Sequence, residues 1–107
     1  MPRVIIHNLF DKTVNTTDSY RPLLRHLHDH GQDWMHACGG KGRCTTCKFR
    51  VLQGEEGIAP RTAVELRYHQ AGELASGERL ACQAIIEDDV TIAVPDEYKL
   101  PHLIYSD

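Results

Sequence analysis

The chain has 107 residues, of which 41% are hydrophobic and 25% are charged, and its formal net charge is −3. This length and composition exclude a disordered chain and predict a single packed domain spanning residues 1–107. The small net charge excludes a nucleic-acid-binding protein that depends on a strongly basic surface.

The charged residues are divided unevenly along the chain. Residues 1–54 carry a net charge of +4, and residues 55–89 carry −5. This division indicates either a surface dipole that steers a partner or an ordinary solvated surface. No apolar run reaches the roughly 20 residues that span a membrane, and the segment MPRVIIHNLF does not have the form of a signal peptide. We therefore expect a cytoplasmic protein that does not bind membranes.

The first part of the chain predicts a hairpin followed by a helix. β-Branched residues within 3–7 and 12–16 predict two strands joined by a polar turn. Ser19 and Pro22 are typical of a helix start, and the leucines that follow form one apolar face. Gly31 is a suitable residue to end this helix.

The second part of the chain predicts three further strands. Residues 47–52 alternate between polar and apolar side chains, and residues 85–86 and 90–94 are β-branched or apolar. Pro95 is expected to end the last strand. Residues 72–79 are predicted to form a loop.

A second helix is predicted over residues 61–70. Thr62 and Glu65 have the spacing of a capping box, although the cap can equally fall one residue earlier. With the predicted strands, this gives an α+β fold: a mixed sheet with one main packed helix.

The four cysteines have a distinctive spacing. Three lie in the segment CGGKGRCTTC, with five residues between Cys38 and Cys44 and two between Cys44 and Cys47. Another 34 residues separate Cys47 from Cys82. In a cytosolic protein, such cysteines are more typical of metal ligands or redox groups than of structural disulfides.

The chemistry of a [2Fe–2S] cluster accounts for this pattern. Such a cluster requires four thiolates, two on each iron. The glycines between Cys38 and Cys44 permit a tightly curved loop and allow backbone N–H groups to approach the sulfurs. Lys41 and Arg43 either favour the reduced cluster or are solvent-exposed loop charges. No catalytic residue is predicted, and the expected ligands of the cofactor and its metal are Cys38, Cys44, Cys47 and Cys82.

The segment CGGKGRCTTC and the segment GERLACQ around Cys82 resemble the [2Fe–2S] ferredoxin family, which has a β-grasp fold. The spacing of five and then two is that of the bacterial and vertebrate, adrenodoxin-like type. The resemblance implies a cluster-binding loop, with Cys38 and Cys44 on an outer iron near the surface and Cys47 with Cys82 on an inner iron. Lys48 departs from the family, because adrenodoxin-like proteins usually have histidine directly after the third cysteine.

This resemblance implies a one-electron carrier that is not an enzyme. It is expected to be a monomer that binds a ferredoxin reductase and an acceptor redox enzyme transiently. The second helix and the cluster loop are expected to form the docking face, with Glu65 and Glu73 as its charged residues. The alternatives are a redox-sensing iron–sulfur protein and a small electron-transfer subunit of a larger complex.

Two other kinds of cysteine site fit the spacing poorly. A structural zinc site prefers paired short spacings. A thioredoxin-like dithiol at Cys44 and Cys47 requires a helix start after a strand, whereas a strand is predicted to follow this pair.

His26 and His30 lie four residues apart on the predicted first helix and are interpreted as surface histidines. Trp34 and Met35 are predicted to cover the apolar side of the cysteine loop, and the alternative for both is packing in the core.

Overall fold

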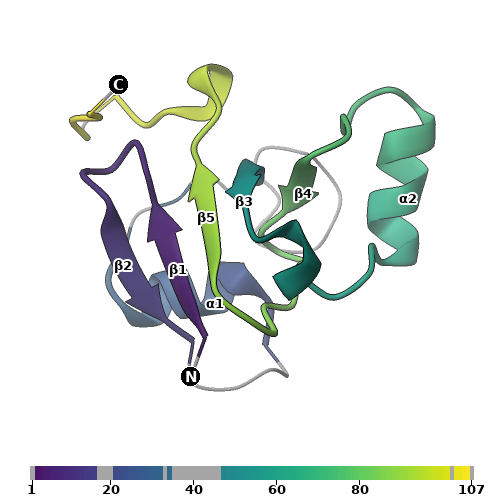
Figure 1. Cartoon of the computed structure of the whole chain (residues 1–107). Helices are drawn as coiled ribbons and strands as arrows, with labels where there is room; N and C mark the ends of the chain where they lie inside the picture. Colours follow the sequence, from purple (N-terminus) through teal and green to yellow (C-terminus); the bar gives the residue numbers. More distant parts are fainter. Residues whose placement is uncertain (1, 17–20, 33, 35–46, 102, 107) are drawn as a thin grey trace.

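The computed structural model describes residues 2–16, 21–32, 34, 47–101 and 103–106. Within these residues, the chain forms one mixed sheet with a helix across one face and a second helix at its side (Figure 1). None of the helices in this part of the chain has the length and hydrophobicity required to span a bilayer.

The sheet has five strands in the order β2-β1-β5-β3-β4. The first and last strands in the sequence are parallel neighbours, and the other pairs are antiparallel. The strands are β1 (Arg3–Ile6), β2 (Lys12–Asn15), β3 (Lys48–Gln53), β4 (Glu78–Leu80) and β5 (Val90–Ala93).

The two α-helices occupy different positions. Helix α1 (Leu23–Asp29) lies behind the sheet in Figure 1, and α2 (Ala63–Gln70) lies beyond β4. Two short 3₁₀ turns, η1 (Glu55–Gly57) and η2 (Asp96–Tyr98), follow β3 and β5. The capping box of α2 is confirmed, with Thr62 as the N-cap residue.

One hydrophobic core lies between the sheet and α1. Alternate strand residues point into it, and the leucines of α1 cover them from the other side. Removing such side chains from water is the main favourable contribution to folding, at about 25 cal/mol per Å² of apolar surface. Its fully buried members include Val4, Ile6, Val14, Leu23, Leu27, Phe49 and Ile92.

The predicted α+β class is confirmed, with differences in two segments. Strand β4 lies partly within residues 72–79, which were predicted to be a loop. Its central residue, Arg79, is charged but 4% exposed, so no apolar alternation marks the strand in the sequence. Residues 85–86 were predicted to be a strand, but only a single bridge between Ile86 and Ile58 forms there. The prediction of one domain over residues 1–107 stays a prediction.

The interpretation of His26 as a surface residue is wrong. This side chain on α1 is only 2% exposed, and its Nε2 has no hydrogen-bond partner among the described residues. His30 is exposed, and its Nδ1 lies 2.9 Å from the carbonyl oxygen of His26. The two rings therefore lie in different environments, and no cluster of three metal-ligating side chains forms in the described parts of the chain.

Candidate functional site

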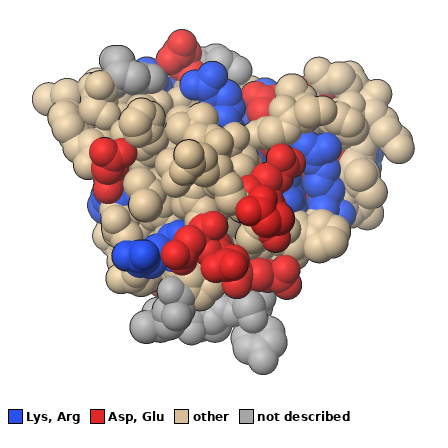
Figure 2. Space-filling view, viewed as in Figure 1, with Lys and Arg blue, Asp and Glu red and all other residues tan. Residues whose placement is uncertain are grey.

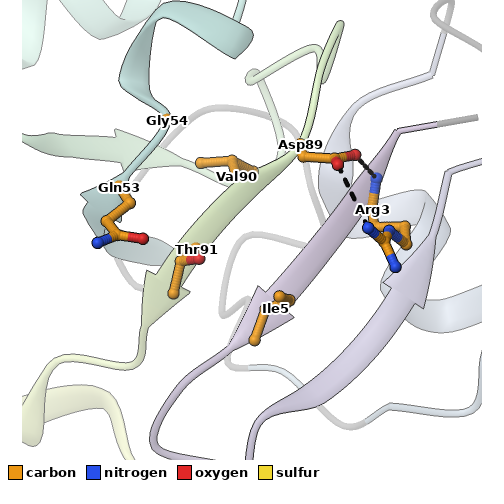
Figure 3. A pocket seen from close by; sticks show the side chains of 7 residues that line it. All are labelled: Arg3, Ile5, Gln53, Gly54, Asp89, Val90 and Thr91. Carbon is orange, nitrogen blue, oxygen red and sulfur yellow. Dashed lines mark hydrogen bonds and ion pairs between the residues drawn. The ribbon is translucent and has the colours of Figure 1, made fainter.

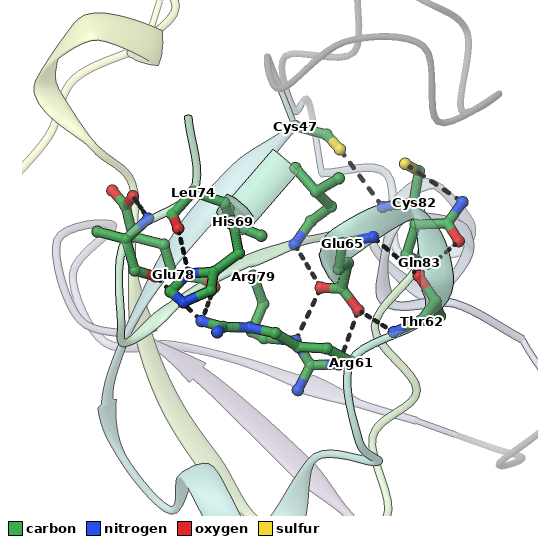
Figure 4. Close-up of polar contacts among 12 residues, drawn as sticks. Cys47, Arg61, Thr62, Glu65, His69, Leu74, Glu78, Arg79, Cys82 and Gln83 are labelled. Atoms are coloured by element: carbon green, nitrogen blue, oxygen red, sulfur yellow. Dashed lines mark hydrogen bonds and ion pairs between the residues drawn. The ribbon is translucent and has the colours of Figure 1, made fainter. Parts of the chain in front are cut away.

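The structure brings together two of the four predicted ligands. Cys47 directly precedes β3, and Cys82 lies in the turn that follows β4. Because β3 and β4 pair antiparallel, with Lys48 opposite Leu80, the two cysteines meet at the same end of the pair. The backbone N–H of Cys82 donates to the Sγ of Cys47 at 3.4 Å (Figure 4). Neither cysteine forms a disulfide among the described residues.

The other two predicted ligands, Cys38 and Cys44, lie outside the described residues, as do Lys41 and Arg43. Their place relative to Cys47 and Cys82 stays a prediction. The described half of the site nevertheless shows how the fold holds a pair of sulfurs that are 35 positions apart in the sequence.

The turn around Cys82 is held by helix α1. The N–H groups of Leu23 and Leu24 donate to the carbonyl oxygens of Ala84 and Ala81, each at 2.8 Å. These N–H groups belong to the first helical turn, which has no partners within its own helix. Pro22 precedes them and supplies no side-chain cap. The turn that carries Cys82 therefore supplies hydrogen-bond acceptors for two N–H groups at the start of α1.

The carbonyl oxygen of Cys47 is held from two sides. It accepts a hydrogen bond from the Nε1–H of Trp34 at 3.1 Å and another from the N–H of Ala81 at 3.2 Å. Trp34 is 5% exposed and belongs to the hydrophobic core, as the core-packing alternative expects. Met35 and the cysteine loop that the two residues were expected to cover lie outside the described residues. These two hydrogen bonds hold the backbone of Cys47 in place and do not involve its sulfur.

Replacing Trp34 by phenylalanine is expected to weaken the site without unfolding the chain. The phenyl ring fills most of the same buried space, but it cannot donate to the carbonyl of Cys47. That carbonyl keeps its hydrogen bond from Ala81, so the loss of one hydrogen bond costs about 0.5–1.5 kcal/mol. The visible absorbance of a reconstituted cofactor should therefore decay several-fold faster than in the unmodified protein when challenged with a chelator. Decay at the unmodified rate would contradict the anchoring role of Trp34.

A buried ion pair joins helix α2 to the strand before Cys82. The carboxylate of Glu65, 0% exposed, accepts from Arg79 Nε at 2.7 Å and from Arg79 Nη2 at 2.9 Å. It also accepts from the N–H groups of Leu80 at 3.0 Å and Thr62 at 3.1 Å (Figure 4). The expectation that Glu65 lies on an exposed docking face is therefore wrong, because the side chain is turned inward towards β4.

Gln83 makes a second connection between α2 and Cys82. Its Oε1 accepts from the Oγ1–H of Thr62 at 3.1 Å, and its Nε2 lies 3.9 Å from the Sγ of Cys82. Sequence reasoning missed this residue. Its position directly after the predicted ligand Cys82 was the available signal.

The donor chemistry of this pair suits iron. The pKa of the Cys47 thiol is raised above its ordinary value, first by the hydrogen bond with the Cys82 side chain and then by burial. A metal that binds such a thiol displaces its proton. Soft thiolates that receive backbone N–H bonds are the ligands that iron–sulfur clusters require.

A shallow pocket lies far from these sulfurs. It is lined by residues of β1, β3 and β5 together with Gly54, and the Arg3–Asp89 ion pair stands at its edge (Figure 3). Gly54 has a φ of +81°, and a Cβ there would lie 2.5 Å from the carbonyl oxygen of Asp89, so only glycine fits. Since Gly54 and Cys47 stand at opposite ends of β3, a separation of about 20 Å along the strand, the pocket is not part of the cysteine site.

Comparison with known proteins identifies the family. The 2Fe-2S iron-sulfur cluster binding domain matches residues 9–87. The chain belongs to this family. Its predicted β-grasp [2Fe–2S] ferredoxin fold and its predicted cofactor, a [2Fe–2S] cluster, are thereby confirmed.

Relatives include both small ferredoxins and domains of larger proteins. The chain is 34% identical to 2Fe-2S ferredoxin-5 of Aquifex aeolicus, covering 89% of this chain and 100% of that one. It is 37% identical to a subunit of the Na(+)-translocating NADH-quinone reductase of Psychrobacter cryohalolentis, covering 71% of this chain. The match spans only 18% of that larger protein.

A solved structure agrees with this family over nearly the whole chain. The ISC-like [2Fe-2S] ferredoxin (FdxB) from Pseudomonas putida superimposes with a TM-score of 0.71 at 29% identity, covering 95% of this chain and 98% of that one. These likenesses support the predicted role as a [2Fe–2S] electron carrier.

Proposed function

We propose that the protein carries single electrons on a [2Fe–2S] cluster between a reductase and an acceptor enzyme, without substrate chemistry of its own. The observation that carries this proposal is the meeting of Cys47 with Cys82 at one end of the β3–β4 pair, in a chain of the 2Fe-2S family. When bound, the cluster supplies a reversible one-electron redox centre. The proposed ligands are Cys38, Cys44, Cys47 and Cys82.

The described residues around the site have two tasks. They place the Cys47 and Cys82 sulfurs beside each other, and they limit water around them, since the two cysteines are 0% and 5% exposed. The N–H of Cys82 also donates to the Cys47 sulfur and so stabilises negative charge on it. A rigid, dry environment keeps structural change during electron transfer small.

An acidic patch on the surface supports binding to basic partners. It consists of Glu55, Glu56, Glu87, Asp88 and Asp89, all exposed. The N–H groups of residues 87 and 88 donate to the carbonyl of Gly57 at 2.7 and 2.9 Å, which brings the two acidic segments together. Figure 2 shows acidic side chains gathered on this face. Such a field speeds the approach of an oppositely charged protein.

The larger relatives favour a second candidate, an electron-transfer subunit or domain of a larger complex. Besides the NADH-quinone reductase relative, the Amycolatopsis cytochrome P450 reductase GcoB contains a region with a TM-score of 0.70 to this chain, at 29% identity and covering 27% of GcoB. A stable complex with a flavoprotein on gel filtration would favour this candidate, whereas a monomer that reacts only transiently would favour the free carrier. The cytoplasmic location stays a prediction.

Iron and acid-labile sulfide analysis of anaerobically purified protein tests the proposal. We expect two irons and two sulfides per chain, a red-brown colour, and an electron paramagnetic resonance signal that appears on reduction and integrates to one spin. Protein that holds neither iron nor sulfide after anaerobic reconstitution would overturn the proposal. Zinc in a colourless protein would indicate a structural site instead.

Charge reversal at Glu73 is expected to slow electron transfer from a reductase. This exposed residue lies three positions beyond the end of α2. Its carbonyl oxygen accepts a hydrogen bond at 3.2 Å from the Nζ of Lys48, the residue directly after Cys47, so it lies on the side of the molecule that a partner must approach. Glu73→Lys should lower the rate at least about threefold at low ionic strength, and the difference should shrink as salt is added. Stopped-flow reduction by a purified ferredoxin reductase measures this rate.

Glu56→Lys makes the same charge change within the acidic patch, beyond the opposite end of β3 from Cys47. The two variants therefore separate the two faces, and a larger loss of rate in Glu56→Lys would place docking on the acidic patch. If both variants slow the reaction equally, net charge and not the α2 side governs docking. Equal rates for Glu73→Lys and the unmodified protein would show that the α2 side is not the docking face.

A further inference from the structure

Gln83 links the cap of helix α2 to the sulfur of a predicted ligand. One end of its amide accepts a hydrogen bond from Thr62 Oγ1 at 3.1 Å, and the other end places Nε2 3.9 Å from Cys82 Sγ. Figure 4 shows the amide between the two side chains. We propose that Gln83 is a positioning residue whose amide N–H stabilises negative charge on the Cys82 sulfur and so raises the reduction potential of the bound cluster. This inference rests on the proposed function.

The hydroxyl of Thr62 determines which end of the amide faces the sulfur. Thr62 Oγ1 accepts a hydrogen bond from the Glu65 N–H at 3.2 Å, so its single hydrogen is available to an acceptor on the other side. The acceptor is the amide oxygen of Gln83, which leaves the NH₂ group facing Cys82. The reverse orientation would place a carbonyl oxygen against a negatively charged sulfur and leave the Thr62 hydrogen without that acceptor.

Thr62 itself cannot turn away without loss of the helix cap. Its side chain and that of Glu65 form the two reciprocal hydrogen bonds of a capping box. The Glu65 carboxylate is held in turn by two nitrogens of Arg79 and by the N–H of Leu80. The orientation of the Gln83 amide is therefore fixed by buried structure on the side away from the sulfur.

The charge change on reduction gives this contact its effect. One added electron increases the negative charge shared by the ligand sulfurs, so a donor aimed at sulfur favours the reduced state over the oxidised one. A neutral amide does this without changing the charge of the protein. Its contribution to the potential is also independent of pH.

Gln83→Met tests the proposal, because methionine keeps the length of the side chain and removes the donor. We expect the potential to become more negative, by roughly a threefold to tenfold change in the reduction equilibrium constant, where tenfold corresponds to about 59 mV for one electron. The control is Gln70→Met, the same change at an exposed residue at the end of α2. It should leave the midpoint potential, measured by spectroelectrochemical titration, unchanged.

Two variants of Thr62 separate charge stabilisation from structural support. Thr62→Val removes the hydroxyl that orients the amide and should shift the potential in the same direction as Gln83→Met, while Thr62→Ser should restore it. A Gln83→Met protein with a full cluster and the unmodified potential would overturn the inference. If Gln83→Met assembles no cluster, an unmodified potential in Thr62→Val overturns it instead. An unmodified protein without iron would instead refute the proposed function.

Discussion

Arg79→Met is expected to destabilise the protein by about 3–5 kcal/mol, because it leaves the buried carboxylate of Glu65 without its counter-charge. Arg79 and Glu65 side chains are 5% and 0% exposed, so water cannot replace the lost partner. For a domain of this size, such a loss lowers the melting temperature by tens of degrees. Thermal unfolding followed by circular dichroism measures it.

The exposed pair of Arg21 and Asp29 provides the control. Its side chains are 54% and 49% exposed at an N–O distance of 3.3 Å, and Arg21→Met should cost less than about 1 kcal/mol. A double variant with methionine at both 65 and 79 should regain part of the loss, since no charge remains buried, although the N–H groups of Leu80 and Thr62 lose their acceptor. A melting temperature near that of the unmodified protein in Arg79→Met would show that the pair is not a structural requirement.

Cys82→Ala is expected to abolish assembly of a stable cluster. It removes one of the four proposed thiolate ligands, and the alanine methyl group offers no replacement ligand at a position that is 5% exposed. The turn itself should persist, because its bonds to α1 come from the backbone of Ala81 and Ala84. Iron content, sulfide content and the visible spectrum after reconstitution measure the loss.

The far-ultraviolet circular dichroism spectrum is the control for Cys82→Ala and should retain the signal of a folded chain. Cys47→Ala should give the same loss of cluster. A complete visible spectrum in either variant would show that the ligand set is wrong at that position.

The sequence predicted the elements whose signals are local. The hairpin, α1, β3, β5 and the capping box of α2 each follow from a few neighbouring residues. Strand β4 was missed because burial of Arg79 depends on Glu65, which lies 14 residues earlier. The same long-range pair explains why Glu65 was assigned to the surface, since its spacing from Thr62 predicted its capping bond but not its inward direction.

The candidate site was predictable in composition but not in its supporting contacts. The spacing of the cysteines alone predicted the candidate ligands. The contacts of Cys47 with Trp34 and of Cys82 with Gln83 arise from folding and leave no periodic pattern. The exposure of the histidines was also not predictable from spacing. His26 lies on the buried side of α1, whereas His30, one turn later, is exposed.

The parallel pairing of β1 with β5 has a consequence for the order of folding. Strand β5 joins the two halves of the sheet, and its Val90 pairs with Val4 of β1. The sheet therefore cannot close until the ribosome has synthesised the chain as far as β5. A contact this distant in sequence closes slowly, because the entropy of a long loop must be lost first. During synthesis on the ribosome, the three-cysteine segment therefore emerges well before the sheet can close, and a cluster inserted at that stage would have no fourth sulfur from Cys82. Cofactor loading is expected to follow the emergence of β5, which iron incorporation into nascent chains stalled before and after this strand leaves the ribosome would test.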